Sequence, residues 1–138
     1  MRKRESRQVK QPRWISKKAL LLLHAESLAE FGGASGLRDE GLLDSSLARP
    51  QNIQAYQPEC NLAELAAAYG FGIAKNHAFV DGNKRAAFLG IGLFLAINGY
   101  QLMATQVAAI QTMLNVASSE MNEAALASWI KANIIPAD

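Results

Sequence analysis

Apolar residues recur every three or four positions along most of the chain, which predicts helices rather than strands. In the first such segment, residues 14–31, Ser16 is a candidate N-cap, and the two glycines that follow the segment are a stop signal. Further helical patterns cover residues 62–77, 83–97, about 104–118 and 123–133. We therefore expect an all-α protein.

The chain between the first two of these helices has a weaker pattern. The sequence LRDEGLLDSSLA, residues 37–48, predicts a short helix that ends at Arg49-Pro50, because the residue before a proline disfavours helical geometry. Residues 50–61 contain two prolines and two asparagines without strong periodicity, so we expect a loop or flap there. At most one short strand pair is expected, close to this flap.

One long stretch of the chain lacks charge. No charged side chain occurs between Ala86 and Ser119, which predicts that the helix at 83–97 runs through the middle of the molecule. A glycine inside a helix costs up to about 1 kcal/mol relative to alanine, so glycines there suggest that helix backbones approach closely. Four such glycines are Gly70, Gly72, Gly90 and Gly92. The predicted architecture is a helical bundle around a central buried helix.

Length and composition agree with a single globular domain. The chain has 138 residues, of which 50% are hydrophobic and 19% charged. Its longest run free of polar side chains has 12 residues, at 86–97, whereas a membrane-spanning helix needs about 20. The single cysteine, Cys60, rules out an internal disulfide. We expect a soluble protein of a reducing cytoplasm.

Positive charge is concentrated at the start of the chain. Residues 1–13 hold six of the 14 Lys and Arg residues and one acid, whereas residues 14–138 hold 8 cations and 11 anions, a net charge of −3. We expect a disordered basic leader at 1–13 and the folded domain at 14–138. A leader that arises from an upstream start codon would have no role, whereas a functional one would contact nucleic acid or an acidic partner.

The stretch NHAFVDGNKRAAF, residues 76–88, contains the candidate chemistry. Asp81-Gly82 marks a turn and Asn83 is a candidate N-cap, so the stretch predicts a helix, a tight loop and a second helix. Lys84 and Arg85 then fall in the first turn of the second helix, where the helix dipole favours anions over cations. A phosphate bound at this helix start would pair with both cations.

Two further side chains complete a candidate site for phosphoryl or nucleotidyl transfer. Asp81 offers a carboxylate to a Mg²⁺ ion that also binds phosphate oxygens, and His77 offers a nitrogen that can accept a proton from an attacking hydroxyl. Each residue also has a plainer interpretation, because histidines cap helices, Asp-Gly forms turns and Lys-Arg pairs are common on surfaces. The ordered set is more specific than its members.

The segment HAFVDGNKR resembles the signature of the Fic/Doc family in the form found in its death-on-curing, or Doc, branch. The flanking segments LRDEGLLDSSLARPQ, LAELAAAYGFGIAKNH and AAFLGIGLFLAINGY look similar to the same branch, so the resemblance covers about residues 14–133. It implies a Fic/Doc-like all-α helical bundle with a short flap near the active site. We expect the flap at 50–61, where a target would dock.

The resemblance also implies roles for individual residues. His77 corresponds to the general base, Phe79 to the residue that anchors the loop in the core, and Asp81 to the Mg²⁺-binding acid. Arg85 corresponds to a phosphate-binding arginine, and the amides around Asn83 to an anion hole. The residues that would hold ATP are Gly82, Asn83, Lys84 and Arg85.

Lys84 distinguishes two reactions within this family. Members that transfer AMP usually have glycine at this position, whereas the Doc branch has lysine and transfers the γ-phosphate of ATP as a protein kinase. The resemblance therefore favours a Mg²⁺- and ATP-dependent kinase, with an AMP transferase as the alternative. A third interpretation, from a different class, is a non-catalytic binding protein in which the anion site is vestigial.

Doc-like proteins are toxins that phosphorylate translation elongation factor Tu and are silenced by a Phd-like antitoxin in trans. The resemblance implies the same target and partner here. Some Fic proteins carry an inhibitory helix motif in their own chain. Residues 119–123 have the spacing of that motif, but Ala124 stands where Gly or Asn is expected, so inhibition should come from another chain.

Two other residues receive plain interpretations. His24 lies near Glu26 in the first predicted helix, and we expect a solvated or capping histidine. Cys60 lies in the predicted flap without a partner cysteine, and nothing marks it as reactive.

Overall fold

Residues 11–137 are described by the computed structural model, and they form six helices and one pair of strands. The helices are α1 (Lys17–Phe31), α2 (Glu40–Tyr56), α3 (Leu62–Asn76), α4 (Asn83–Ile97), α5 (Gln106–Ala117) and α6 (Glu123–Ala132). The strands are β1 (Tyr100–Leu102) and β2 (Ile134–Pro136). All five helices predicted from periodicity are present, so the all-α fold class is confirmed.

Five of these six helices begin at a side-chain cap. In each, the side chain of the N-cap residue accepts a hydrogen bond from a backbone amide of the first turn. The caps are Ser16, Asp39, Asn61, Thr105 and Asn122. The exception is α4, because its N-cap is Gly82 and no side chain caps it. The first amides of α4 therefore remain available to a ligand.

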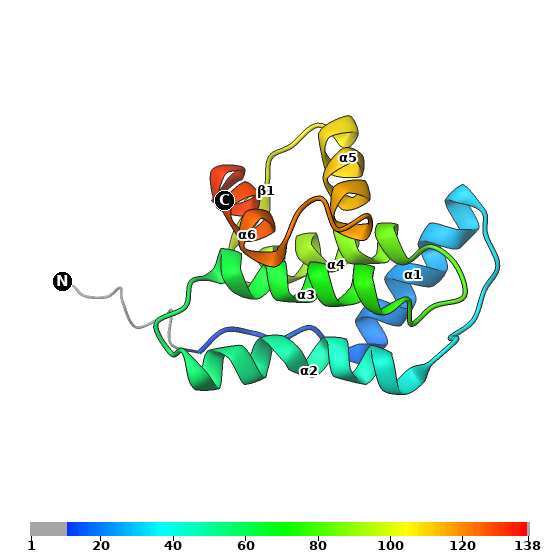
Figure 1. Ribbon diagram of the computed structural model, residues 1–138, viewed down its shortest axis with the longest axis horizontal. Helices are drawn as coiled ribbons and strands as arrows, with labels where there is room; N and C mark the ends of the chain where they lie inside the picture. The colour runs from blue at the N-terminus through cyan, green and yellow to red at the C-terminus, as the bar shows by residue number, and fades with distance from the viewer. Residues whose placement is uncertain (1–10, 138) are drawn as a thin grey trace.

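The helix at the centre of the bundle is α3. It buries ten of its fifteen residues and packs against α2, α4, α5 and α6. The neighbouring α4, which the uncharged stretch indicated as the central helix, buries seven of its fifteen residues. Figure 1 shows α2 along one side of α3, with α5 and α6 along the other. The predicted bundle around a buried helix is confirmed, but the innermost helix is α3 and not the predicted helix at 83–97.

Two of the four glycines that the sequence indicated as close contacts allow α3 and α4 to approach closely. A Cβ added to Gly70 would lie 2.4 Å from Cδ1 of Ile91, and one added to Gly90 would lie 3.1 Å from an isoleucine side chain of α3. At Gly72 a Cβ would make an ordinary contact at 3.5 Å, and at Gly92 it would meet nothing within 4 Å. The expectation is therefore confirmed for Gly70 and Gly90 and wrong for Gly92.

The proline that was expected to end α2 lies inside it. The buried face of α2 consists of Leu43, Ser46, Leu47 and Pro50, spaced so that all four lie on one side of the helix. Burial of the Pro50 ring on this face, which packs against α3, offsets the hydrogen bond that proline cannot donate. Residues 50–56 are thus helical, and only 57–61 remain as a loop.

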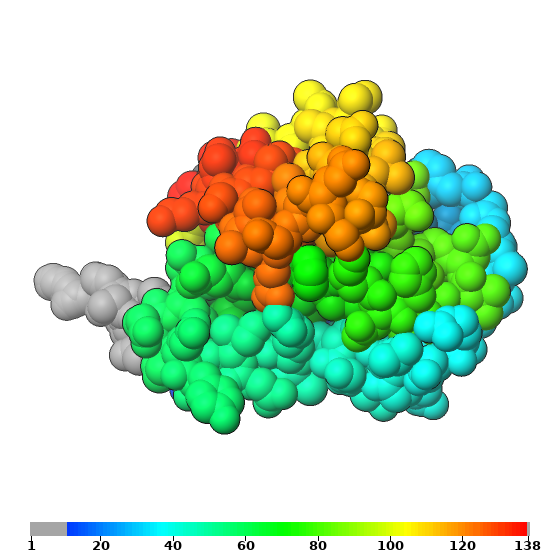
Figure 2. Space-filling model, in the orientation of Figure 1, coloured from blue at the N-terminus to red at the C-terminus, as the bar shows by residue number. Residues whose placement is uncertain are grey.

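The predicted position of the flap is also wrong. Figure 1 shows α2 and α3 side by side in opposite directions, so the end of α2 lies near the start of α3, whereas the HAFVDGNKR segment follows the end of α3. The segment that contacts this motif is residues 32–39, which we call the Gly-rich segment. Its Leu37 forms an isolated antiparallel bridge with Phe79. In Figure 2 the lime-green motif region lies at the surface beside the blue end of α1 and the cyan residues that follow it.

The strand pair does not include residues 50–61. Strands β1 and β2 are antiparallel, with Tyr100 opposite Pro136 and Leu102 opposite Ile134. The pair joins the chain that leaves α4 to the chain that leaves α6, so the prediction of one short strand pair holds but its predicted position is wrong.

The ends of the chain add little to this picture. Residues 1–10, most of the predicted leader, lie outside the described residues. Arg13 is joined to the domain, because its amide donates to Oδ1 of Asn98 at 2.8 Å and its carbonyl accepts from Nδ2 at 3.0 Å. None of the helices in the described part of the chain has the length and apolar character needed to cross a membrane.

Candidate functional site

The motif begins where α3 ends in a left-handed residue. His77 is the C-cap of α3, with φ 52° and ψ 48°, a conformation that turns the chain sharply out of the helix. One residue of the Gly-rich segment holds this turn. Arg38 donates from Nε to the carbonyl of His77 at 2.7 Å, from Nη2 to that of Asn76 at 3.1 Å, and from its own amide to that of Ala78 at 2.7 Å. The guanidinium also lies where the negative end of the α3 dipole favours a cation.

Asn83 closes the loop between α3 and α4, residues 77–82, from its other end. Its side-chain Oδ1 accepts from the amide of Phe79 at 3.0 Å, and its Nδ2 donates to the carbonyl of the same residue at 3.0 Å. Both residues are buried, and the Phe79 ring lies in the hydrophobic core. The prediction that Asn83 caps α4 is therefore wrong, because Gly82 is the N-cap with φ 76° and the Asn83 side chain binds backward. The Phe79 core position matches the anchoring role that the resemblance implied.

The Gly-rich segment runs along the outside of this loop. The amide of Val80 donates to the carbonyl of Gly36 at 3.0 Å, and the amide of Asp39 donates to the carbonyl of Ala78 at 3.0 Å. Sequence reasoning gave the Gly-rich segment no role, although its position next to the motif is the one expected of the flap.

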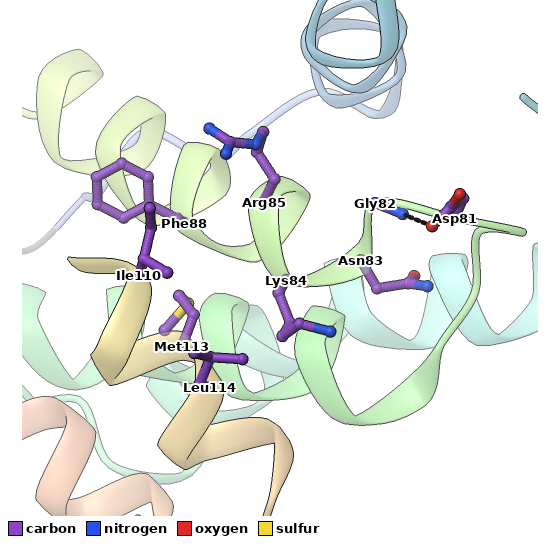
Figure 3. Close-up of a pocket in the computed structure, with 9 residues that line it drawn as sticks. All are labelled: Asp81, Gly82, Asn83, Lys84, Arg85, Phe88, Ile110, Met113 and Leu114. Carbon is purple, nitrogen blue, oxygen red and sulfur yellow. Dashed lines mark hydrogen bonds between the residues drawn. The ribbon is translucent and has the colours of Figure 1, made fainter. Parts of the chain in front are cut away.

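The Asp81 carboxylate is exposed and held by two backbone amides. Its Oδ1 accepts from the amide of Gly82 at 3.0 Å, the bond drawn in Figure 3, and its Oδ2 accepts from the amide of Ala34 at 3.2 Å. Each carboxylate oxygen can accept more than one bond, so lone pairs remain for a cation. The Gly-rich segment comes so close that a Cβ on Gly33 would lie 3.0 Å from Oδ2.

Sequence reasoning also misjudged His24. It is only 5% exposed, its ring stacks on that of Phe79 with centroids 3.7 Å apart, and its Nε2 lies 2.8 Å from the carbonyl oxygen of Asp81. The expected solvated or capping histidine is therefore wrong. A signal was present in the sequence, because His24 shares the helical spacing of Leu20 and Ser27, the other buried residues of α1.

A pocket of about 270 Å³ opens at the start of α4. Its lining residues are Asp81, Gly82, Asn83, Lys84, Arg85, Phe88, Ile110, Met113 and Leu114. Figure 3 shows the polar members on the loop and first turn of α4, and the apolar members on α5 and at Phe88. Five of the six predicted site residues therefore surround one pocket. The sixth, His77, is exposed at the other end of the loop and does not line the pocket.

The two cations at the start of α4 point in different directions. Figure 3 shows the side chains of Lys84 and Arg85 on opposite sides of the first turn. The Arg85 guanidinium lies over the ring of Phe31, the last residue of α1, at 3.7 Å from its centroid. Within residues 11–137, neither cation forms an ion pair with a carboxylate. The two cations at the uncapped helix start are thus left without a carboxylate partner in an ion pair within this part of the chain.

The donor set agrees with a cation that binds mainly through phosphate. Within residues 11–137, no three His, Cys, Asp or Glu side chains form a metal-binding group, so Asp81 is the carboxylate available at the pocket. Mg²⁺ in nucleotide sites uses one or two carboxylates together with substrate phosphates and waters. The residues present fit that pattern and do not form a protein cage for a metal alone.

Comparison with known proteins agrees with the motif and its surroundings. The profile of the Fic/DOC family matches residues 14–95, which include α1, α2, α3, the loop and most of α4. The chain belongs to the Fic/DOC family. It is 48% identical over 87 residues to Toxin Doc of Mycolicibacterium smegmatis (strain ATCC 700084 / mc(2)155). This match covers 60% of this chain and 64% of that protein. It is 32% identical over 119 residues to Protein kinase doc of Escherichia phage P1, which covers 86% of this chain and 94% of that protein.

Both relatives bear the name Doc, which supports the Doc branch of the Fic/DOC family that the motif indicated. The matched part of the mycobacterial relative is a little under two thirds of its length, whereas the phage relative is matched almost end to end.

Proposed function

We propose that this Fic/DOC protein is the toxin of a toxin–antitoxin pair and acts as a protein kinase that transfers the γ-phosphate of ATP to a Ser or Thr hydroxyl. The observation that carries the proposal is the start of α4. It is the one described helix without a side-chain cap, and Asp81, Lys84 and Arg85 surround its free amides. The names of the two relatives, a toxin and a protein kinase, support both parts of the proposal.

The chain's own residues would divide the work of the reaction. The free amides of α4, Lys84 and Arg85 would bind phosphate oxygens, and Asp81 would hold Mg²⁺, which neutralises phosphate charge when bound. His77 would accept the proton of the target hydroxyl as its oxygen forms a bond to the γ-phosphorus. The bond from that phosphorus to the bridging oxygen breaks, and ADP leaves with the electron pair.

His77 fits the role of a base that meets a macromolecular substrate. It is exposed and lies outside the pocket that would hold the nucleotide, so a target hydroxyl could approach it from solvent. The Gly-rich segment binds the carbonyl of His77 through Arg38, and Val80, three residues further along the loop, is exposed. We therefore place target contact there, and not at residues 50–61. Elongation factor Tu is the target to test first, which would make translation arrest in the cytoplasm the cellular effect.

We also propose that inhibition comes from a Phd-like antitoxin on another chain. The segment 119–123, which has the spacing of an internal inhibitory motif, follows α5 and ends at the first residue of α6. Its Ser119 Oγ is engaged by Nζ of Lys75 from α3, a contact distinct from the phosphate pocket.

Isotope position separates the possible reactions. The purified protein is incubated with Mg²⁺, elongation factor Tu and ATP labelled at either the γ- or the α-phosphate. A kinase transfers the γ-label only, an AMP transferase transfers the α-label, and a binding protein transfers neither. His77→Ala should abolish labelling and relieve growth arrest on expression. Growth arrest that persists unchanged in His77→Ala, without label on any protein, would overturn the proposal.

A further inference from the structure

His24 connects α1 to the Asp81–Gly82 peptide, at the end of the loop that precedes α4. It is buried at the middle of α1 and stands 57 residues before Asp81, whose carbonyl oxygen it contacts at 2.8 Å. Because a carbonyl oxygen only accepts hydrogen bonds, Nε2 carries the proton and donates it. The stack on Phe79 fixes the plane of the ring, so both His24 contacts are made to the loop that precedes α4.

This hydrogen bond orients more than one atom. The Asp81–Gly82 peptide is planar and trans, so fixing its carbonyl toward His24 directs the Gly82 amide to the opposite side. That amide donates to Oδ1 of the Asp81 carboxylate at 3.0 Å. The position of the carboxylate is therefore coupled to His24 through one rigid peptide.

The space around the His24 ring also restricts Gly82, which is the N-cap residue of α4 and has no side chain to cap the helix. A Cβ at Gly82 would lie 3.5 Å from Nε2 of His24 and 3.3 Å from Cδ2 of Leu28, while the residue needs φ 76°. Side chains of α1 thus contact the turn that directs the first amides of α4 toward the pocket.

We infer that His24 is a positioning residue for the proposed transfer: it holds the Asp81–Gly82 peptide so that the Asp81 carboxylate and the α4 amides face the same phosphates. This inference rests on the proposed function. His24 is not placed among the catalytic groups, because it is 5% exposed and its Nε2 proton is already donated to the protein backbone.

Three substitutions separate the hydrogen bond from the packing of the ring. His24→Gln keeps an N–H donor at the distance of Nε2, whereas His24→Asn keeps a side-chain amide that is too short to reach. His24→Phe keeps an aromatic ring against Phe79 and removes the donor. Leu20→Val is the matched control, because Leu20 is fully buried one turn earlier in α1 and lies near Gly90, not the loop.

The readouts are the affinity of the full chain for Mg²⁺ and ATP by calorimetry, the KM and kcat of transfer, and amide hydrogen exchange at Gly82 and Asn83. For His24→Asn and His24→Phe we expect Mg²⁺-ATP affinity to weaken and KM to rise about 5- to 10-fold, the effect of one net hydrogen bond. Exchange at the two amides should become faster. His24→Gln should restore all three values to within about 2-fold of the wild type, and Leu20→Val should lower only the melting temperature.

The outcomes distinguish the two proposals. Wild-type affinity and wild-type exchange in folded His24→Phe and His24→Asn would overturn the positioning role. The positioning role would also be overturned if His24→Gln bound Mg²⁺-ATP no more tightly than His24→Asn, or if its two amides exchanged no more slowly. A wild-type protein that binds Mg²⁺-ATP but transfers no label would contradict the proposed kinase function. The affinity and exchange measurements would still test whether His24 positions the Asp81–Gly82 peptide.

Discussion

At the scale of single residues, the site depends on side chains that bind the backbone of the loop rather than a ligand. Arg38 binds three successive carbonyls at the end of α3, and Asn83 binds both polar groups of Phe79. His77 needs such support, because a left-handed conformation in a residue other than glycine costs roughly 1–2 kcal/mol. The arrangement of the candidate base is therefore maintained by Asn83 within the motif and by Arg38 outside it.

Arg38→Ala tests this support. It removes the two guanidinium bonds to α3 carbonyls and leaves the backbone bond to Ala78, so we expect a loss of stability of about 1 kcal/mol. We expect a fall in kcat of roughly 10-fold or more, because a small displacement of a proton acceptor reduces rate strongly. Thermal denaturation and labelled-ATP transfer measure the two effects.

The matched control is Arg49→Ala, which removes an exposed arginine whose Nη2 pairs with Glu123, between α2 and α6. It should leave kcat unchanged and lower stability by about 1 kcal/mol at most. Equal kcat in Arg38→Ala and Arg49→Ala would contradict a role for Arg38 at the loop.

Cys60 provides a prediction about pH. Burial raises the pKa of the Cys60 thiol, and the nearby Glu64 and Glu59 carboxylates add to the effect. The thiolate is the reactive form, and a raised pKa means less thiolate at any pH below it. We expect a disulfide reagent to modify the native protein at pH 8 more slowly than the same protein in denaturant, with the native rate still rising above the ordinary thiol pKa. Equal rates in the two states would show that the thiol is accessible and unperturbed.

At the scale of elements, the contact between α3 and α4 depends on the absence of particular side chains. A methyl group at Gly70 would overlap Ile91, which is itself fully buried, whereas a methyl group at Gly92 would point into open space. The packing therefore requires glycine at Gly70 in α3, whereas it leaves room for a side chain at Gly92 in α4. The close approach matters for the site, because α4 begins at the proposed phosphate-binding turn and His77 is the C-cap of α3.

The pair of substitutions Gly70→Ala and Gly92→Ala tests this contact. Gly70→Ala should destabilise the protein by about 1–3 kcal/mol through overpacking, and Gly92→Ala should stabilise it by up to about 1 kcal/mol through helix propensity. Ile91→Val, which shortens the overlapping side chain, should reduce the cost of Gly70→Ala when both changes are combined. Chemical denaturation gives all the values. A Gly70→Ala variant as stable as Gly92→Ala would show that the helices can separate freely.

Elements differ in how far the sequence predicts them. The helices with strong periodicity and good caps, such as α3 with Asn61 and Glu64 in a capping box, are local structures and were predicted near their observed ends. The path of α2 through Pro50 was not predictable from local rules, because it depends on burial against α3. The flap was misplaced for the same reason, since loop composition at 50–61 does not reveal which end of the bundle a segment occupies.

At the scale of the whole molecule, the candidate site has a local part and an assembled part. Residues 81–85 are consecutive, so the sequence alone brings them to one helix start. His24, Ala34 and Arg38 come from 39 to 57 residues away and meet the loop only because α1 and the Gly-rich segment fold over it. Contacts of this kind leave no motif in a single sequence. The residues 81–85 that line the pocket were therefore predictable from the sequence, whereas the residues that support the loop were not.

The whole fold should respond to the ligand that this site is proposed to bind. A ligand that binds only the folded state adds about 2.7 kcal/mol of stability when its concentration is 100 times its Kd. We expect saturating Mg²⁺-ATP to raise the melting temperature of the wild type by several degrees, because phosphate would neutralise the uncapped start of α4 and its two cations. Raising the salt concentration should weaken the effect, since ions screen exposed charges.

Charge at the site, rather than charge on the molecule, should determine that shift. The double substitution Lys84→Ala and Arg85→Ala should remove most of it, although Arg85→Ala also removes the stack on Phe31 and so lowers the baseline stability. Comparing each variant with and without nucleotide cancels that baseline. Lys131→Ala, which removes one cation from the last turn of α6, should keep the full shift. An equal shift in all three proteins would mean that the nucleotide binds elsewhere, and no shift in the wild type would leave the open end of α4 without its proposed ligand.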